Sequence, residues 1–274
     1  MIPSSEPIAI FAGRGALPKM LIENCQKNGR KFLLFLLESE DYEIDYSALS
    51  PIKLHYGSVG KFLEILQQNQ IKNLIFIGAV NKPSFSEIKV DKKGAILLAK
   101  IIASKILGDD AVLRAVINFF EKEGLKIVKI DEFLNDIVAK KSVLTKLQPT
   151  AQSLADIDLA RKAIRTMSEF DIGQSVIVAQ KQIIAVEAAE GTDAMIKRCG
   201  DLNIAFKKDA ILVKMKKLNQ SGKVDLPTIG VDTIKNCKLH GINGIAIQAG
   251  VTLIIDKGEV AKLADESGIF LIAI

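Results

Sequence analysis

The sequence predicts two α/β domains joined by a linker: an N-terminal Rossmann-like parallel sheet and a C-terminal mixed-sheet domain. Three observations predict this fold class. Short apolar runs alternate with amphipathic segments in the first half, which is typical of a parallel sheet covered by helices on both faces. The second half repeats this alternation after an apolar hairpin. The chain has 274 residues, 49% of them hydrophobic, which is enough for one or two domains with full cores.

The first half contains three apolar runs, each followed by a segment of helical periodicity. We expect strands at 7–13, 31–37 and 73–80 and, within 125–134, a fourth. We expect helices at 16–29 and 60–71, and two more within 94–124 that are separated at Gly108.

The regular pattern fades near the middle of the chain, where Pro149 lies among several serines and threonines. We therefore expect a first domain at 1–135, a linker at 136–158 and a second domain at 159–274. The elements around and after the linker are expected as a hairpin at 174–188, strands at 210–217, 244–250, 252–256 and 269–274, and helices at 153–170, 192–200, 231–241 and 258–268.

The positive charge is mostly dispersed. The net charge is +5, and the only tight basic group is formed by Lys214, Lys216, Lys217 and Lys223. Aromatic residues make up 5% of the chain and tryptophan is absent, so a nucleic-acid platform of stacked rings is not expected. A local site for an anionic ligand fits this distribution better.

The cysteines and the N-terminal residues indicate the compartment. The three cysteines lie far apart without a CxxC pair, which favours a reducing cytoplasm over a disulfide or zinc framework. The N-terminus lacks the basic and apolar regions of a signal peptide, and the longest apolar run is interrupted by Lys100 and Lys105.

Two strand ends in the first half are candidate ligand sites. Gly13 and Gly15 form a Gly-x-Gly turn between a strand and a helix, where free amides suit a phosphate. Asn81 and Lys82 follow the third strand, and ligands bind beyond the carboxyl ends of such strands. The alternatives are a tight turn at the glycines and a strand ended by Pro83.

The segment 183–198 gathers Glu187, Glu190 and Asp193 where a strand ends and a helix begins. If Thr192 caps the helix, the first helical amides can bind an anion. Carboxylates beside a phosphate suggest a bridging Mg²⁺, which prefers oxygen ligands. The alternative is a capped helix with acids favoured by its dipole.

A second charged loop follows the strand expected at 210–217. It contains Lys217, Lys223 and Asp225 and is bounded by Pro227 and Gly230. Cations and a carboxylate together suit phosphoryl chemistry, because they neutralise charge and hold water or metal. A solvated charged loop is the alternative.

Common hydrolase motifs are missing from the sequence. The chain has two histidines and no G-x-S-x-G, H-E-x-x-H, P-loop or CxxC motif. If the protein is an enzyme, carboxylates, lysines and Mg²⁺ must carry its chemistry.

Several stretches of the chain, in order, are characteristic of one family: IAIFAGRGALP, GAV-x-x-P, GDDAVLRAV, FDIGQSVIV, AVEAAEGTDAMIKR, VDLPTIG and GIAIQAG. Through them the whole chain from Ile8 to the C-terminus resembles the LpxI family of UDP-2,3-diacylglucosamine pyrophosphatases. The resemblance implies a cytoplasmic, Mg²⁺-dependent hydrolase of lipid A biosynthesis in a Gram-negative bacterium. Its substrate would be UDP-2,3-diacylglucosamine and its products 2,3-diacylglucosamine 1-phosphate and UMP, with peripheral contact to the inner membrane.

Under this resemblance, two carboxylates would hold Mg²⁺ and water, namely Asp225 and Asp193. Two others would support them as general base or by hydrogen bonding, namely Glu187 and Glu190. The phosphate and the nucleotide would be bound by Lys82, Thr192, Lys217, Lys223, Gly13 and Gly15.

The chain departs from the family pattern at four positions. Leu218 stands where the family has a proline, Ser221 where it has an acid, and Lys82 and Lys223 where it has arginines. Lysine keeps the charge but loses the bidentate fork that suits phosphate, and Ser221 removes a candidate metal ligand. The catalytic role therefore falls on Asp225.

Two alternatives stay open on the sequence. A nicotinamide-dependent oxidoreductase would use the turn at Gly13, although Pro18 occupies the place of its third glycine. A non-catalytic lipid- or nucleotide-binding protein would keep the fold and lose the chemistry, which the changes at Leu218, Ser221 and Lys82 favour.

Overall fold

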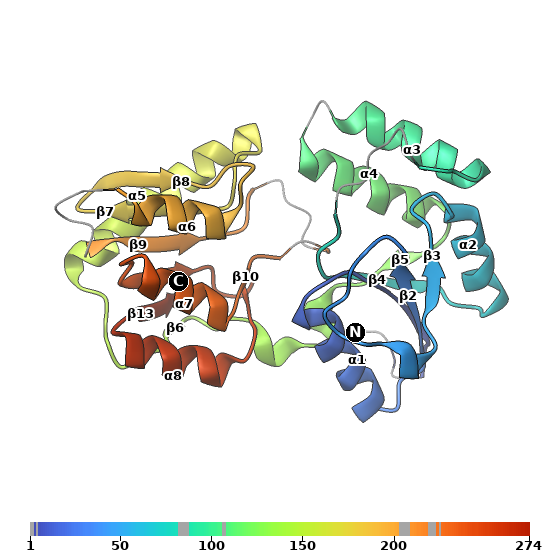
Figure 1. The fold of residues 1–274 in the computed structure, drawn as a ribbon, viewed down its shortest axis with the longest axis horizontal. Helices are drawn as coiled ribbons and strands as arrows, with labels where there is room; N and C mark the ends of the chain where they lie inside the picture. Colours follow the sequence, from blue (N-terminus) through green and yellow to red (C-terminus); the bar gives the residue numbers. More distant parts are fainter. Residues whose placement is uncertain are drawn as a thin grey trace. The chain divides into compact units, whose positions relative to one another are not determined.

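The structure is a computed structural model that describes residues 3, 5–81, 88–105, 108–202, 209–218, 223–224 and 226–274, without the side chains of Lys105 and Asp109. The chain forms two compact units (Figure 1). The N-terminal unit comprises Met1–Asn135 with Ser221–Val224, and the C-terminal unit comprises Asp136–Gln220 with Asp225–Ile274.

A five-stranded sheet forms the centre of the N-terminal unit, with strand order β3-β2-β1-β4-β5 and all pairs parallel. The strands are β1 (Ile8–Ala12), β2 (Phe32–Leu37), β3 (Ile52–Leu54), β4 (Asn73–Ile77) and β5 (Lys126–Ile127). The order reverses at β1, which pairs with β2 on one side and β4 on the other. This arrangement confirms the predicted Rossmann-like parallel sheet.

Phenylalanine rings pack the helices of this unit against the sheet. Phe62 and Phe120, each on a helix, contact strand residues Phe11, Phe35 and Phe76 with ring centroids 4.7 to 5.6 Å apart. Such aromatic pairs add specific geometry to the burial of apolar area. The helices are α1 (Ala16–Lys27), α2 (Val59–Gln68), α3 (Lys92–Lys105) and α4 (Asp109–Lys122), with the short 3₁₀ helix η1 (Ser47–Leu49).

A six-stranded mixed sheet forms the centre of the C-terminal unit, with strand order β6-β13-β11-β9-β7-β8. The strands β9, β11 and β13 are parallel to one another, whereas β6, β7 and β8 join by antiparallel pairs. The strands are β6 (Ser142–Val143), β7 (Ser175–Ala179), β8 (Gln182–Val186), β9 (Ile211–Lys214), β11 (Gly244–Ile247) and β13 (Phe270–Ala273). A separate parallel pair contains β10 (Thr228–Ile229) and β12 (Leu253–Ile254). The predicted mixed sheet is confirmed.

Strand residues of the C-terminal sheet alternate between two helical layers. Val176 and Val213 pack on α5, whereas Ile177 and Leu212 share a core with α6, α7 and α8. Because successive side chains point to opposite faces, both faces of the strands are apolar. The helices are α5 (Ala151–Met167), α6 (Thr192–Gly200), α7 (Val231–Leu239) and α8 (Lys257–Ser267), with the 3₁₀ turn η4 (Ser168–Phe170) after α5.

Two segments differ from the predicted elements. The segment 125–134 contains only two strand residues, and the 3₁₀ turns η2 (Ile130–Glu132) and η3 (Asn135–Ile137) follow it. The segment 136–158, predicted as a linker, contains β6 and the first turns of α5. The domain limits inferred from the sequence stay a prediction.

Candidate functional site

The carboxyl edge of the C-terminal sheet collects the polar residues of this unit. The parallel strand β9 ends there at Lys214, and the antiparallel strand β7 begins there at Ser175, which is paired in register with Lys214. The strand β8 ends there at Val186, so Glu187 follows at the same edge. Ligands of open α/β sheets bind beyond this edge.

A buried lysine and two hydroxyls lie together at this edge. Lys214 Nζ donates to Thr192 Oγ1 at 2.9 Å, and Ser175 Oγ lies 3.2 Å from the same Thr192 oxygen. Lys214 is 9% exposed and Ser175 is fully buried. A cation removed from water needs polar partners of this kind, and it attracts an anionic ligand strongly.

Thr192 has a different position from the one expected. Gly191 is the N-cap of α6, with φ of 83°, and Thr192 is the first helical residue. The prediction that Thr192 caps the helix is therefore wrong, and the Met195 amide, expected to be available for an anion, donates to Gly191 O. Glycine adopts this backbone conformation without strain, which leaves the threonine hydroxyl for Lys214 and Ser175.

Glu187 is buried beside the turn that precedes β7. Its side chain accepts a hydrogen bond from the Gln174 amide at 3.3 Å, and its own amide donates to Ser175 O at 3.0 Å. A Cβ on Gly173 would lie 2.0 Å from Glu187 O, and its φ is 42°. Only glycine fits there, so the backbone of this turn fixes where the Glu187 carboxylate lies.

Lys217 adds a second mostly buried cation near the end of β9. Its ammonium pairs with the Asp171 carboxylate, and its side chain is 12% exposed. Asp171 adopts the left-handed conformation, with φ of 57°, directly after η4. The neighbouring Lys216 is held through its backbone, since its amide donates to Gln248 Oε1 at 3.0 Å.

The other two acids of the segment 183–198 have partners of their own. Glu190 pairs with Arg198 at 2.8 Å, and this hydrogen bond lowers the pKa of Glu190 below its ordinary value. Asp193 accepts a hydrogen bond from Asn236 Nδ2 at 3.0 Å. Within the described part of the chain, no group of three or more His, Cys, Asp or Glu residues is arranged to hold a metal ion.

The remaining predicted site residues are distributed over the chain. Lys82, Ser221 and Asp225 lie outside the described residues. Lys223 belongs to the N-terminal unit, where its ammonium pairs with Glu121 of α4.

The Gly-x-Gly turn of the N-terminal unit is hydrogen-bonded to the segment after β4. The amides of Gly13 and Arg14 donate to Ile77 O and Ala79 O, each at 2.7 Å. A Cβ on Gly13 would lie 2.3 Å from Ala79 O, so the glycine permits this close approach. The Gly15 amide faces Glu43 Oε2 at 3.4 Å.

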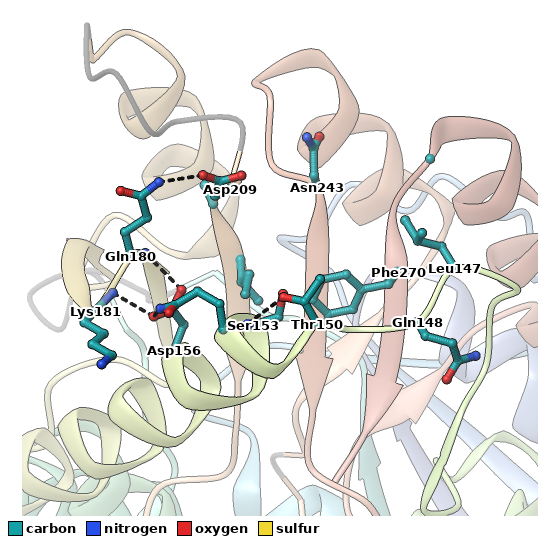
Figure 2. A pocket seen from close by; sticks show the side chains of 14 residues that line it. Leu147, Gln148, Thr150, Ser153, Asp156, Gln180, Lys181, Asp209, Asn243 and Phe270 are labelled. Atoms are coloured by element: carbon teal, nitrogen blue, oxygen red, sulfur yellow. Dashed lines mark hydrogen bonds between the residues drawn. The ribbon is translucent and has the colours of Figure 1, made fainter.

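A pocket of about 650 Å³ opens at the opposite edge of the C-terminal sheet, beside the start of α5 (Figure 2). Its buried carboxylate, Asp156, accepts hydrogen bonds from the amides of Gln180 and Lys181 at 2.9 and 2.7 Å. Gln152 Nε2 donates to the same carboxylate at 2.8 Å. Asp156 therefore holds the β7–β8 turn, and the catalytic candidates lie at the other edge.

Sequence reasoning missed Lys214, Ser175 and Gln174 as site residues. A signal for Lys214 was present, because a lysine ends the otherwise apolar strand Ile211–Lys214. Ser175 and Gln174 carry no comparable signal, since their importance depends on strand pairing.

The fold and the site together define the class of this protein. It has two α/β units, with a buried lysine and hydroxyls at the carboxyl edge of its second sheet. The chain belongs to the LpxI family. It matches the LpxI N-terminal domain over residues 7–137 and the LpxI C-terminal domain over residues 140–272. This confirms the resemblance inferred from the sequence.

One curated relative and one solved structure complete the comparison. UDP-2,3-diacylglucosamine pyrophosphatase LpxI of Caulobacter vibrioides is 36% identical over 273 residues, covering 97% of each chain. A short chain dehydrogenase from Leptospira borgpetersenii with bound NAD⁺ matches 40% of this chain and 46% of its own. Its identity of 14% and TM-score of 0.23 carry no argument. Among the described helices, none has the length and hydropathy needed to cross a membrane.

Proposed function

We propose that this protein hydrolyses the pyrophosphate bond of UDP-2,3-diacylglucosamine, giving 2,3-diacylglucosamine 1-phosphate and UMP in lipid A biosynthesis. The relative that is 36% identical over 97% of the chain carries this proposal, because it is named for this pyrophosphatase activity. The oxidoreductase and the non-catalytic binding protein are not favoured by the family match. Cytoplasmic location with peripheral contact to the inner membrane belongs to the same proposal.

The cations at the carboxyl edge of the C-terminal sheet bind the phosphate in this proposal. Lys214 and Thr192 are already hydrogen-bonded to each other, so a phosphate oxygen beside them meets a charged donor and a hydroxyl in fixed positions. Lys217, close to Lys214 in sequence, is held by Asp171 and adds a second cation. Fixed donors of this kind stabilise the charge that develops when a phosphoryl group is attacked.

The carboxylates orient water and a divalent cation. Glu187 lies at the same edge, held by the Gln174 amide, and serves as general base or orients the nucleophile. Asp225 and Asp193 would hold Mg²⁺, with Glu190 in support. When bound, Mg²⁺ polarises a phosphoryl oxygen and lowers the pKa of its water. The described acids alone do not form a complete metal site, so the metal assignment depends on Asp225.

Four further residues complete the proposal. Lys82 and Lys223 contribute positive charge to substrate binding. Gly13 and Gly15 shape the turn at the nucleotide end, where the observed hydrogen bonds favour close backbone packing as the role of Gly13.

Turnover of UDP-2,3-diacylglucosamine with titrated Mg²⁺ tests the proposal. Asp225→Asn should reduce kcat by roughly a thousandfold or more, because the amide keeps the volume and loses the charge that a metal or water needs. The control is Asp232→Asn on α7, whose side chain is 93% exposed and should not affect turnover. Absence of lipid product at every Mg²⁺ concentration would contradict the function, and near-normal kcat in Asp225→Asn would contradict the role of Asp225.

A further inference from the structure

A single buried carboxylate joins three loops at the carboxyl edge of the N-terminal sheet. The Glu40 side chain is fully buried and follows β2. It accepts hydrogen bonds from the Asn81 amide at 2.7 Å and from Asn81 Nδ2 at 3.1 Å, and the Tyr56 hydroxyl lies 2.8 Å away. Arg14 Nε lies 3.0 Å from Glu40 Oε2, the oxygen that also accepts from Asn81 Nδ2, as an ion pair without hydrogen-bond geometry. A carboxylate with this many donors is satisfied despite its burial.

These contacts fix the guanidinium of Arg14 from one side. Its Nε faces Glu40 and its Nη2 donates to Asn81 Oδ1 at 2.8 Å. The Arg14 side chain is 32% exposed, whereas that of Glu40 is 0% exposed, so the solvent-facing part of the pair is cationic. The side-chain hydrogen bond of Arg14 to Asn81 uses Nη2 and not Nη1.

Two amides of the turn are already used by the backbone. The Gly13 and Arg14 amides, which would bind a phosphate in a dinucleotide fold, already donate to Ile77 O and Ala79 O. The strand order reverses at β1, and ligands of such sheets bind at this reversal. An anion at this edge therefore meets the guanidinium of Arg14 as its fixed donor.

We infer that Arg14 recognises the phosphate of a uridine nucleotide and that Glu40 is the positioning residue that orients its guanidinium. This inference rests on the proposed function and names the residue that binds the UMP portion of the substrate. Arginine suits the role because its planar fork matches two phosphate oxygens, and an oriented fork loses less entropy on binding.

Binding of UMP, uridine and inorganic phosphate to the full chain tests the inference by titration calorimetry. Arg14→Gln should weaken UMP binding by about ten- to a hundredfold, whereas uridine binding should not change because uridine lacks the phosphate. Arg14→Lys should keep part of the affinity. The matched control is Arg30→Gln in the same unit, since Arg30 Nη1 donates to Pro3 O and Glu6 O at the other end of β1.

Glu40→Gln separates positioning from folding. We expect KM for the nucleotide substrate to rise about tenfold with kcat nearly unchanged, because ground-state and transition-state binding are lost together. Tyr56→Phe loosens the same network without a change of charge and should raise KM by a smaller factor. A lowered melting temperature in both variants with KM and UMP affinity unchanged would make the network purely structural and overturn the inference.

The outcomes distinguish this inference from the proposed function. If the parent binds UMP through Arg14 but releases no lipid product, the nucleotide site stands and the pyrophosphatase proposal fails. If the parent hydrolyses the substrate and Arg14→Gln binds UMP equally well, the inference fails and the function stands. Failure of the parent to bind UMP overturns the inference as well.

Discussion

The two sheets bury opposite charges at their carboxyl edges. In the N-terminal unit a carboxylate, Glu40, is the buried centre, and Arg14, Tyr56 and Asn81 converge on it. In the C-terminal unit a lysine, Lys214, is the buried centre, and it donates to Thr192 beside Ser175. A buried acid organises donors, whereas a buried cation attracts an anion directly.

This difference suggests separate roles for the two edges: ligand positioning at the N-terminal edge and support of the reaction at the C-terminal edge. The Glu40 network uses most of its own hydrogen-bonding capacity and leaves only part of Arg14 exposed, which suits binding of a phosphate in a fixed orientation. The lysine and hydroxyl cluster stands beside the buried Glu187, so a phosphate bound there would have a carboxylate at the same edge. We therefore expect substitutions at the C-terminal edge to reduce kcat and those at the N-terminal edge to raise KM.

Among substitutions that test this comparison of the two edges, we expect the largest loss of activity for Lys214→Met. Methionine fills a similar volume and removes the charge, so kcat should fall by about a hundred- to a thousandfold, as for loss of a fixed donor to a developing charge. Turnover is compared with Lys197→Met on the exposed surface of α6, and both variants are checked by thermal unfolding. Equal activity in parent and Lys214→Met would break the comparison.

Thr192→Ala should have the next largest effect. Loss of a hydrogen bond to a charged phosphate costs about 1.5–3 kcal/mol, so the affinity for the lipid product should fall by roughly ten- to 150-fold. The cap is kept because Gly191 rather than Thr192 is the N-cap, so the free energy of unfolding should fall only by about 1–3 kcal/mol for the hydrogen bonds lost by buried Lys214 and Ser175. Thr192→Ser should restore binding by returning the hydroxyl. Unchanged product affinity in Thr192→Ala would show that its contact with Lys214 is only structural.

The N-terminal network should weaken in alkaline solution. Burial and the hydrogen bond to Glu40 raise the pKa of Tyr56 well above its ordinary value of 10.0. Below that value the phenol is protonated in both states. Above it the unfolded chain loses the proton and the folded chain keeps it, so the free energy of unfolding falls by about 1.4 kcal/mol per pH unit for this group.

Urea unfolding of the parent and Tyr56→Phe between pH 9 and about 11.5 measures this slope. The variant should lose less stability per pH unit, because its ring cannot ionise, although Tyr42 and Tyr46 also have raised pKa values and stay in both proteins. Identical slopes would mean that Tyr56 does not resist ionisation in the folded state.

The elements that the sequence predicted correctly are those long enough to show an apolar run or a period. The strand at Ile8–Ala12 is continuously apolar, and the helix at Ala151–Met167 is recognisable because apolar residues recur every three to four positions. The strands β6 and β10 have two residues each and show no period. The segment after Ile127 was misread because its apolar residues Val128 and Ile130 are buried without forming a strand.

The candidate site was predictable only where a local signal exists. The acids at Glu187, Glu190 and Asp193 stand out in the sequence, but Arg198 and Asn236, far along the helices, engage two of them. Ser175 and Lys214 meet because two strands pair in antiparallel register, and neither residue shows this by itself. Local sequence patterns therefore indicate candidate site residues, but strand pairing determines which of these residues lie at the same edge of the sheet.

The turn between β7 and β8 has a consequence for the order of folding. Gln180 and Lys181 both have positive φ, 45° and 61°, where asparagine and glycine are the usual residues. The turn is therefore a poor nucleus by itself, and Asp156 of α5 supplies the acceptor that its two amides need. We therefore expect the hairpin to form only after α5, because its turn depends on the hydrogen bond from the Gln180 amide to Asp156, 24 residues away in the sequence. Pulsed hydrogen exchange during refolding should protect α5 no later than β7 and β8, and earlier protection of the hairpin would contradict this order.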